Sequence, residues 1–271
     1  MQQYGVIVAD NGSSFFISGA PDERWDNDVL RTLGRFQGSD FEAVDTSALM
    51  VDPRSGRVRP ALDANQAGKY VDAVYLDLLH RASDPGGRAY WAGQLQGGMP
   101  RASFTETIAR SPEWTGVVVA DLYRLALGRD PDPAGLAYWR DMVAARRPVA
   151  DVAADLFGSP ESWALGGGTP EGAVDRIYRH LLGRPPDAAG LAYWSAQVRG
   201  GLPPRALALA LFQSDEHRRD RVTRLYVVLL GRDPDPAGVA YWADALLRRD
   251  DIELAALLAA SDEYVERAQR R

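Results

Sequence analysis

One short segment recurs four times along the chain, and such repetition constrains the fold more than any other feature of the sequence. It reads Leu-Gly-Arg-Asp-Pro-Asp-Pro-Ala-Gly-Leu-Ala-Tyr-Trp over residues 127–139 and returns in similar form over 182–194 and 230–242. A more divergent copy covers 79–91, where His80 stands in place of glycine. We therefore divide the chain into an N-terminal segment, 1–60, and four repeats over 61–115, 116–168, 169–217 and 218–271.

Each repeat has the apolar spacing of three short helices. In the first expected helix, apolar residues recur at i, i+3, i+4, i+7 and i+8, the pattern of one buried helical face. In chain order they are Val71, Val74, Tyr75, Leu78, Leu79; Val119, Leu122, Tyr123, Ala126, Leu127; Val174, Ile177, Tyr178, Leu181, Leu182; and Val222, Leu225, Tyr226, Leu229, Leu230. The third expected helix carries the apolar pairs Phe104/Ile108, Val152/Leu156, Leu207/Leu211 and Leu254/Leu258. The sequence thus predicts a mainly α-helical protein of four tandem three-helix repeats.

Turn and cap residues mark the expected helix ends. A glycine that can adopt a left-handed conformation closes the first helix in three repeats; these are Gly128, Gly183 and Gly231. The second helix is expected to follow an aspartate N-cap; the four aspartates are Asp84, Asp132, Asp187 and Asp235. The third helix is expected to end at a segment such as Ser111-Pro112-Glu113, and residues 166–170 predict a hinge-like turn between the second and third repeats.

The N-terminal segment has a different pattern. Two strand-like runs, 6–9 and 14–17, flank Asp10-Asn11-Gly12-Ser13, which is typical of a tight hairpin turn. Because these runs are apolar on both faces and a lone hairpin is marginal in water, residues 1–60 are expected to be the β-hairpin and short-helix remnant of a larger β-rich domain. Carboxylates here, from Asp10 to Asp45, include candidates for an acid/base pair.

Composition excludes several classes of protein. The net charge of −6 argues against a nucleic-acid partner, which would favour a basic face. The absence of cysteine excludes disulfides and thiolate metal sites. No apolar run is long enough for a membrane span. The chain starts without the basic and apolar regions of a signal peptide, so we expect either a cytoplasmic protein or a piece of a longer one.

The repeat resembles a known bacterial family. The pattern of a tyrosine, then Leu-Gly-Arg-x-Pro-Asp-x-x-Gly-Leu-x-Tyr-Trp, then Ser-x-Glu is similar to domain of unknown function 4214, over about residues 69–265. That family is similar to the helical linker domains of phycobilisomes. The resemblance implies a helical module with an association role in large, often secreted or surface-associated bacterial proteins, and it supplies no catalytic residues. The first repeat departs from the pattern at His80 and Ala82-Ser83.

A second resemblance concerns the N-terminal segment. Tyr4-Gly5-Val6-Ile7-Val8-Ala9-Asp10-Asn11-Gly12-Ser13, with Ser18-Gly19-Ala20-Pro21-Asp22 and Arg24-Trp25, is similar to the closing segment of larger extracellular actinobacterial proteins. It implies an extracellular or cell-surface location.

The Tyr-Trp pair is the main candidate for function. Trp91, Trp139, Trp194 and Trp242 share a helical face with apolar residues and are expected in the core. Neighbouring residues on a helix point about 100° apart, so Tyr90, Tyr138, Tyr193 and Tyr241 must face elsewhere. Packing between repeats is the favoured role, since repeat units bury faces against their neighbours. The alternative is a row of rings that stack on a glycan or peptide.

Charged residues of the motif have two interpretations each. Arg81, Arg129, Arg184 and Arg232 recur with Glu113, Glu161, Glu216 and Glu263. These predict internal ion pairs, and Arg129, Arg184 and Arg232 are also candidates for binding an anionic ligand. The loop from Asp130 to Gly135 has partial calcium-loop spacing, as does the loop from Asp233, but N-capping is the favoured role of Asp132. His80, His180 and His217 share no metal-ligand spacing.

The sequence therefore predicts a non-catalytic helical repeat module for binding or assembly, extracellular or at the cell surface. Its partner would be a glycan, an envelope polymer or another protein, with no nucleic acid and no membrane span. No cofactor is expected, and calcium stays open. The alternative is the C-terminal part of a secreted, glycan-active enzyme whose catalytic domain lies mostly upstream of residue 1.

Overall fold

A computed structural model describes residues 61–271, and every regular element in that range is an α-helix. The predicted β-hairpin remnant and the carboxylates from Asp10 to Asp45 lie outside the described residues. The first helices of the repeats, called A helices, are α2 (Ala64–Leu79), α5 (Pro112–Leu127), α9 (Pro170–Leu182) and α12 (Asp215–Leu230). The B helices are α3 (Pro85–Gln96), α6 (Pro133–Ala144), α10 (Ala188–Arg199) and α13 (Pro236–Ala245). The C helices are α4 (Arg101–Ala109), α7 (Val149–Phe157), α11 (Pro204–Phe212) and α14 (Asp251–Ala260), and two short helices, α8 (Pro160–Leu165) and α15 (Asp262–Gln269), complete the fold.

The cap residues confirm the helix ends expected from the sequence. Every B helix begins after its aspartate, whose carboxylate accepts a hydrogen bond from the main-chain N–H of a glycine three residues on. The glycines after α5, α9 and α12 are left-handed, with φ of 69°, 67° and 71°. The C helices end at the Ser-x-Glu segments, as expected, and each serine is also the N-cap of the next helix, as Ser111 is for α5. A serine hydroxyl there satisfies a main-chain N–H that the helix would otherwise leave free.

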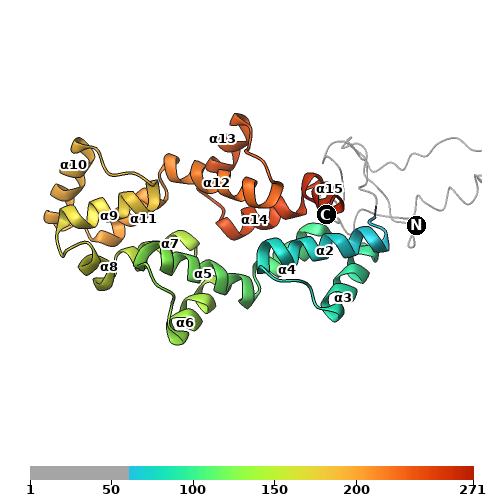
Figure 1. Cartoon of the computed structure of the whole chain (residues 1–271). Helices are drawn as coiled ribbons and strands as arrows, with labels where there is room; N and C mark the ends of the chain where they lie inside the picture. Colours follow the sequence, from blue (N-terminus) through green and yellow to red (C-terminus); the bar gives the residue numbers. More distant parts are fainter. Residues whose placement is uncertain (1–60) are drawn as a thin grey trace, which may run out of the picture. The chain divides into compact units, whose positions relative to one another are not determined.

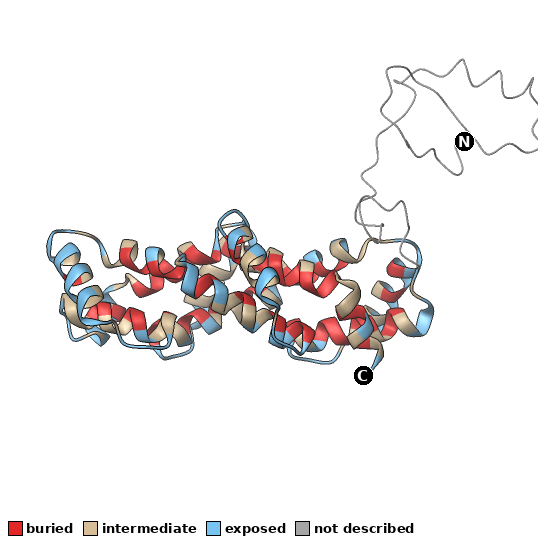
Figure 2. Cartoon of the chain, turned by 90° about the horizontal axis from the view of Figure 1, so that it is seen from above, coloured by how far each residue is buried: buried red, intermediate tan, exposed pale blue. Residues whose placement is uncertain are grey.

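The core lies between the A and C helices. The apolar residues predicted for the A helices are buried, apart from Leu182 and Leu225, which pack against the core while partly exposed. All four apolar pairs of the C helices are buried. Figure 2 shows the buried residues following these helices along the molecule, whereas exposed residues mark the loops. The helical period of the sequence is therefore a reliable guide to which face of each helix is covered.

The A helix is interrupted in the third repeat. The serine that caps α5 and α12 has its counterpart in Ser159, but the helix that follows, α8, ends at Leu165. Gly167 and Gly168 then adopt left-handed conformations, with φ of 78° and 69°, and Thr169 caps α9. The turn expected at residues 166–170 is confirmed, and it is the point at which the chain reverses (Figure 1).

This reversal closes the row of repeats on itself. The largest contacts between repeats join α4 to α14 and α7 to α11, and α15 packs against α2. The Thr105 hydroxyl donates to the Ala256 carbonyl at 2.8 Å, and the Tyr70 hydroxyl donates to the Ala259 carbonyl at 2.9 Å. The first repeat therefore packs on the fourth as well as on its neighbour in sequence.

The closed unit consists of two similar halves, α2–α8 and α9–α15. Each half ends in a short helix after its second repeat, and the contact of α4 with α14 has its counterpart in that of α11 with α7. The sequence alternates in the same way. Repeats one and three share Gly-Gly-x-Pro at 97–100 and 200–203, while repeats two and four share Asp-Pro-Asp-Pro at 130–133 and 233–236. We interpret the helical unit as a duplication of a pair of repeats.

Candidate functional site

The motif arginine of every repeat forms an ion pair with the motif glutamate. Arg129 Nε and Nη2 donate to the two carboxylate oxygens of Glu161 at 2.6 and 2.7 Å. The same bidentate geometry joins Arg81 to Glu113, Arg184 to Glu216 and Arg232 to Glu263. The hydrogen bonds from the arginine hold the pKa of each glutamate below its ordinary value. The internal pairing predicted from the sequence is confirmed in all four repeats.

These arginines also lie over a tyrosine of the A helix. The guanidinium carbon is 5.1–5.7 Å from the ring centre of Tyr75, Tyr123, Tyr178 or Tyr226, within cation–π range. In three repeats the guanidinium donates in addition to the carbonyl of the next residue. Each arginine thus joins the loop after its A helix to the first turn of the helix that comes after the C helix of the same repeat. Ligand binding by Arg129, Arg184 and Arg232 stays a prediction, and it would compete with these contacts.

The A-helix tyrosine explains the glycine of the motif. A Cβ added to Gly135 would lie 2.6 Å from the Tyr123 hydroxyl oxygen. The corresponding distances at Gly87, Gly190 and Gly238 are 3.0, 3.1 and 3.3 Å. A Cβ would therefore clash with the tyrosine in the second repeat and crowd it in the other three, so glycine allows the B helix to cross close to the tyrosine. The sequence pattern alone gives this glycine no role, although its constant spacing from the tyrosine is the signal that could have found one.

The motif tryptophans lie at the edge of the core. Trp91, Trp139, Trp194 and Trp242 pack against buried residues while remaining partly exposed, so their predicted core position is confirmed only in part. In repeats one and four the indole N–H donates to the A-helix tyrosine hydroxyl, at 3.2 and 3.0 Å. Each of these two repeats therefore has a continuous series of side-chain contacts, which runs from the glutamate through the arginine and the A-helix tyrosine to the tryptophan.

The tyrosine before each tryptophan faces solvent. Tyr90, Tyr138, Tyr193 and Tyr241 are 57, 52, 58 and 66% exposed. The expectation that they pack between repeats is wrong, because the B helices pack mainly on the A and C helices of their own repeat and project outward (Figure 1). Each ring meets its neighbouring tryptophan edge to face, at centroid distances of 4.9–5.1 Å. This contact holds the ring in place without covering it.

Small residues surround these exposed rings. Three and four positions before each tyrosine stand only glycine and alanine, at 86–87, 134–135, 189–190 and 237–238. Three positions after it stands Gly93, Asp141, Ala196 or Asp244, all of them exposed. These positions therefore leave each ring uncovered on the side of small residues that precede it in the helix.

The aspartates of the motif loop form hydrogen bonds within the protein. Asp132 Oδ1 accepts the N–H groups of Ala134 and Gly135 at 3.1 and 3.0 Å, while Asp130 accepts from Arg124 Nε at 2.7 Å. The N–H groups at the helix start lower the pKa of Asp132, as they do for Asp84 and Asp235. Within residues 61–271, no group of three or more histidine or acidic side chains is arranged to hold a metal ion. The favoured capping role of Asp132 is confirmed, and calcium binding stays a prediction.

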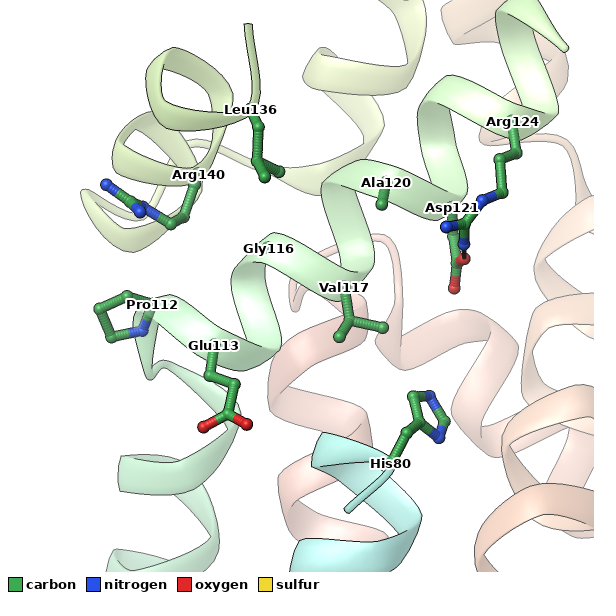
Figure 3. A pocket seen from close by; sticks show the side chains of 10 residues that line it. All are labelled: His80, Pro112, Glu113, Gly116, Val117, Ala120, Asp121, Arg124, Leu136 and Arg140. Carbon is green, nitrogen blue, oxygen red and sulfur yellow. Dashed lines mark hydrogen bonds and ion pairs between the residues drawn. The ribbon is translucent and has the colours of Figure 1, made fainter. Parts of the chain in front are cut away.

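An open hollow of about 500 Å³ lies beside α5 (Figure 3). Val117 and Ala120 of α5 line it together with His80, Arg124 and Arg140. The two arginines are already engaged: Arg124 Nη1 lies 2.8 Å from Asp121 Oδ1, and Arg140 Nη2 lies 2.8 Å from Asp141 Oδ1. Because these charges are paired, the hollow is a weaker candidate for recognition than the exposed tyrosines.

Residues 62–118 and 153–221 match the sequence profile of a family described as domain of unknown function, DUF4214. The resemblance to this family that the repeat shows is confirmed over these two segments. The two matches include the Tyr-Trp pairs of repeats one and three, and the structure shows the same three-helix arrangement in repeats two and four. No curated protein and no solved structure matches the chain. The similarity to phycobilisome linker domains stays a prediction. None of the helices over residues 61–271 is long and apolar enough to cross a membrane.

Proposed function

We propose that this protein is a non-catalytic binding or assembly module that acts outside the cell or at its surface. One observation carries the proposal: an exposed tyrosine is repeated at the same position of all four B helices. A single exposed aromatic residue needs no explanation, since folded surfaces contain many apolar atoms. Four equivalent ones on a repeated scaffold do.

The other residues of the motif have structural roles, so the exposed tyrosine is the motif residue whose repetition the fold does not explain. The arginine and glutamate join the end of the A helix to the helix that comes after the C helix, the left-handed glycine ends the A helix, and the aspartate caps the B helix. The second glycine makes room for the A-helix tyrosine, and the tryptophan packs on the core. The exposed tyrosine contacts the neighbouring tryptophan ring, yet more than half of the tyrosine remains exposed. Its repetition is therefore best explained by contact with a partner.

The chemistry of tyrosine favours a glycan, an envelope polymer or another protein as that partner. The ring offers a flat apolar face for stacking and a hydroxyl for hydrogen bonds, and it loses little conformational freedom on binding. Its edge contact with tryptophan limits that loss further because the ring is already oriented in the free protein.

The test is binding of the purified chain to a microbial glycan array, with calcium and with chelator, followed by pull-down from cell-envelope extract. A variant in which Tyr90, Tyr138, Tyr193 and Tyr241 are all alanine should lose the glycans or proteins that the wild type retains. Leu165→Ala removes a side chain that is 51% exposed on α8, so it is the matched control and should bind normally. Unchanged circular dichroism and thermal unfolding would show that both variants fold. Equal binding by the quadruple variant and the wild type would refute the proposal.

A further inference from the structure

The exposed tyrosines are divided between two opposite edges of the helical unit. The paired C helices lie at the centre, the A helices pack beside them, and the B helices pack on the A helices. Figure 1 shows α3 and α6 projecting from one side of the unit and α10 and α13 from the other. We call the exposed faces of α3 and α6, with Tyr90 and Tyr138, the first edge. Those of α10 and α13, with Tyr193 and Tyr241, form the second edge.

The two edges have the same chemistry. On the first edge, Tyr90 is followed at the third and fourth positions by Gly93 and Gln94; on the second, Tyr193 is followed by Ala196 and Gln197. The other tyrosine of each edge is followed at the third position by an aspartate, Asp141 or Asp244. The two halves thus have the same kinds of residue around their tyrosines. The rings face solvent, so the packing of the halves does not require this similarity.

We propose that each edge is a binding site for one strand of a neutral polysaccharide and that the module cross-links two strands. The proposal rests on the binding role proposed above and names its ligand class and valency. A strand bound to one edge cannot reach the other by a short path, because the whole thickness of the A and C helices lies between the two edges. Two sites that face apart on one rigid body bridge separate strands.

The charges near the rings favour a neutral strand. No charged residue stands three or four positions from Tyr90 or Tyr193, and the single charged neighbour of Tyr138 or Tyr241 is an aspartate. An anionic polymer would meet these carboxylates, and the arginine beside Tyr138, Arg140, is already paired with Asp141 at 2.8 Å. Sugar rings without charge can instead stack on tyrosine and bond to the glutamine amides and aspartate carboxylates beside it.

The experiment uses the full chain and three soluble neutral polysaccharides, dextran, laminarin and xyloglucan, with anionic alginate for comparison. Titration calorimetry with short oligosaccharides of the polymer that binds should give about two sites per chain. Light scattering with the long polymer should show cross-linked aggregates that vanish at excess protein, when every strand is saturated separately. Binding of alginate alone would overturn the inference, as would no binding to any neutral polymer.

Edge variants separate the cross-link from the binding itself. The first-edge variant combines Tyr90→Ala and Tyr138→Ala, and the second-edge variant combines Tyr193→Ala and Tyr241→Ala. Each should keep half of the oligosaccharide sites at unchanged affinity but lose aggregation of the polymer. If either variant loses all sites, the tyrosines form one composite site and the cross-link is refuted while the binding role stands. If the quadruple variant still binds the oligosaccharide, the tyrosine site itself is refuted.

Discussion

Replacement of His217 should weaken the loss of stability on mild acidification. This side chain is 2% exposed in the first turn of α12, where its ring meets Phe212 edge to face at 4.8 Å. Burial lowers its pKa to about 4, and the nearby charge of Arg221 acts in the same direction. The main chain of Leu181 and the carboxylate of Glu216 favour the protonated form, but burial outweighs them.

The magnitude follows from the difference between the folded and unfolded pKa values. The unfolded chain binds a proton at His217 below pH about 6.5, whereas the folded chain does so only below about 4. Between these values the unfolded state holds more protons, so stability falls as the pH falls. The loss is close to zero at pH 7.5, about 2 kcal/mol at pH 5, and about 3 kcal/mol once both states are protonated.

Urea unfolding of the wild type and of His217→Leu at pH 7.5 and pH 5 measures this effect. Whatever the variant does to stability at pH 7.5, it should lose about 2 kcal/mol less than the wild type on going to pH 5. His180→Gln is the comparison. Burial also lowers the His180 pKa, but this side chain is only partly buried, so its replacement should reduce the stability lost between pH 7.5 and pH 5 by less than His217→Leu does. Equal losses in the wild type and His217→Leu would show that His217 titrates normally and that this reasoning is wrong.

Three other changes test the fold and the loops. Trp139→Ala should destabilise the protein by about 3 kcal/mol, the lower end of the range for tryptophan, because the ring is partly exposed; unchanged thermal unfolding would contradict its core contact. His80 occupies the left-handed position that glycine holds after the other A helices, with φ of 55°. In urea titrations, His80→Gly should therefore raise the free energy of unfolding by about 1 kcal/mol, and Gly128→His should lower it by about 1 kcal/mol. Calcium or chelator should leave the melting temperature unchanged; a shift that disappears when Asp130 and Asp233 are both alanine would establish a calcium loop.

The local structure was predictable from the sequence because each signal arises within a few residues. The apolar spacing from Val119 to Leu127 selects one helical face, Asp132 caps the helix that follows it, and Gly128 adopts the left-handed conformation that ends α5. The pair of Arg129 and Glu161 was also predictable, since both residues recur in every repeat, 32 residues apart in three repeats and 31 apart in the fourth. For these features, repetition within the chain replaced the evidence that a set of related sequences would have provided.

The arrangement of the repeats was not predictable, because it depends on which surfaces meet after the helices have formed. The apolar face of α4 has the same spacing whether it packs on the next repeat or on α14. The choice depends on the break between α8 and α9, where Gly167 and Gly168 turn the chain back. For the same reason the sequence favoured the wrong role for Tyr138. The sequence around Tyr138 predicts its position on α6. It does not predict that no other repeat packs against the face of α6 that carries Tyr138.

The Tyr-Trp pair links folding to recognition in a way that decides which variants are informative. Trp139 packs on the core with one face while it meets the edge of Tyr138 at 4.9 Å. Removal of the tryptophan therefore destabilises the repeat and releases the tyrosine ring at the same time, so a loss of binding in Trp139→Ala would have two explanations. Removal of the tyrosine leaves the tryptophan on the core. Because consecutive helical residues point about 100° apart, one dipeptide can hold the scaffold with its second residue and present a ring to a partner with its first. Substitutions of Tyr138 and its three equivalents therefore report on binding separately from folding.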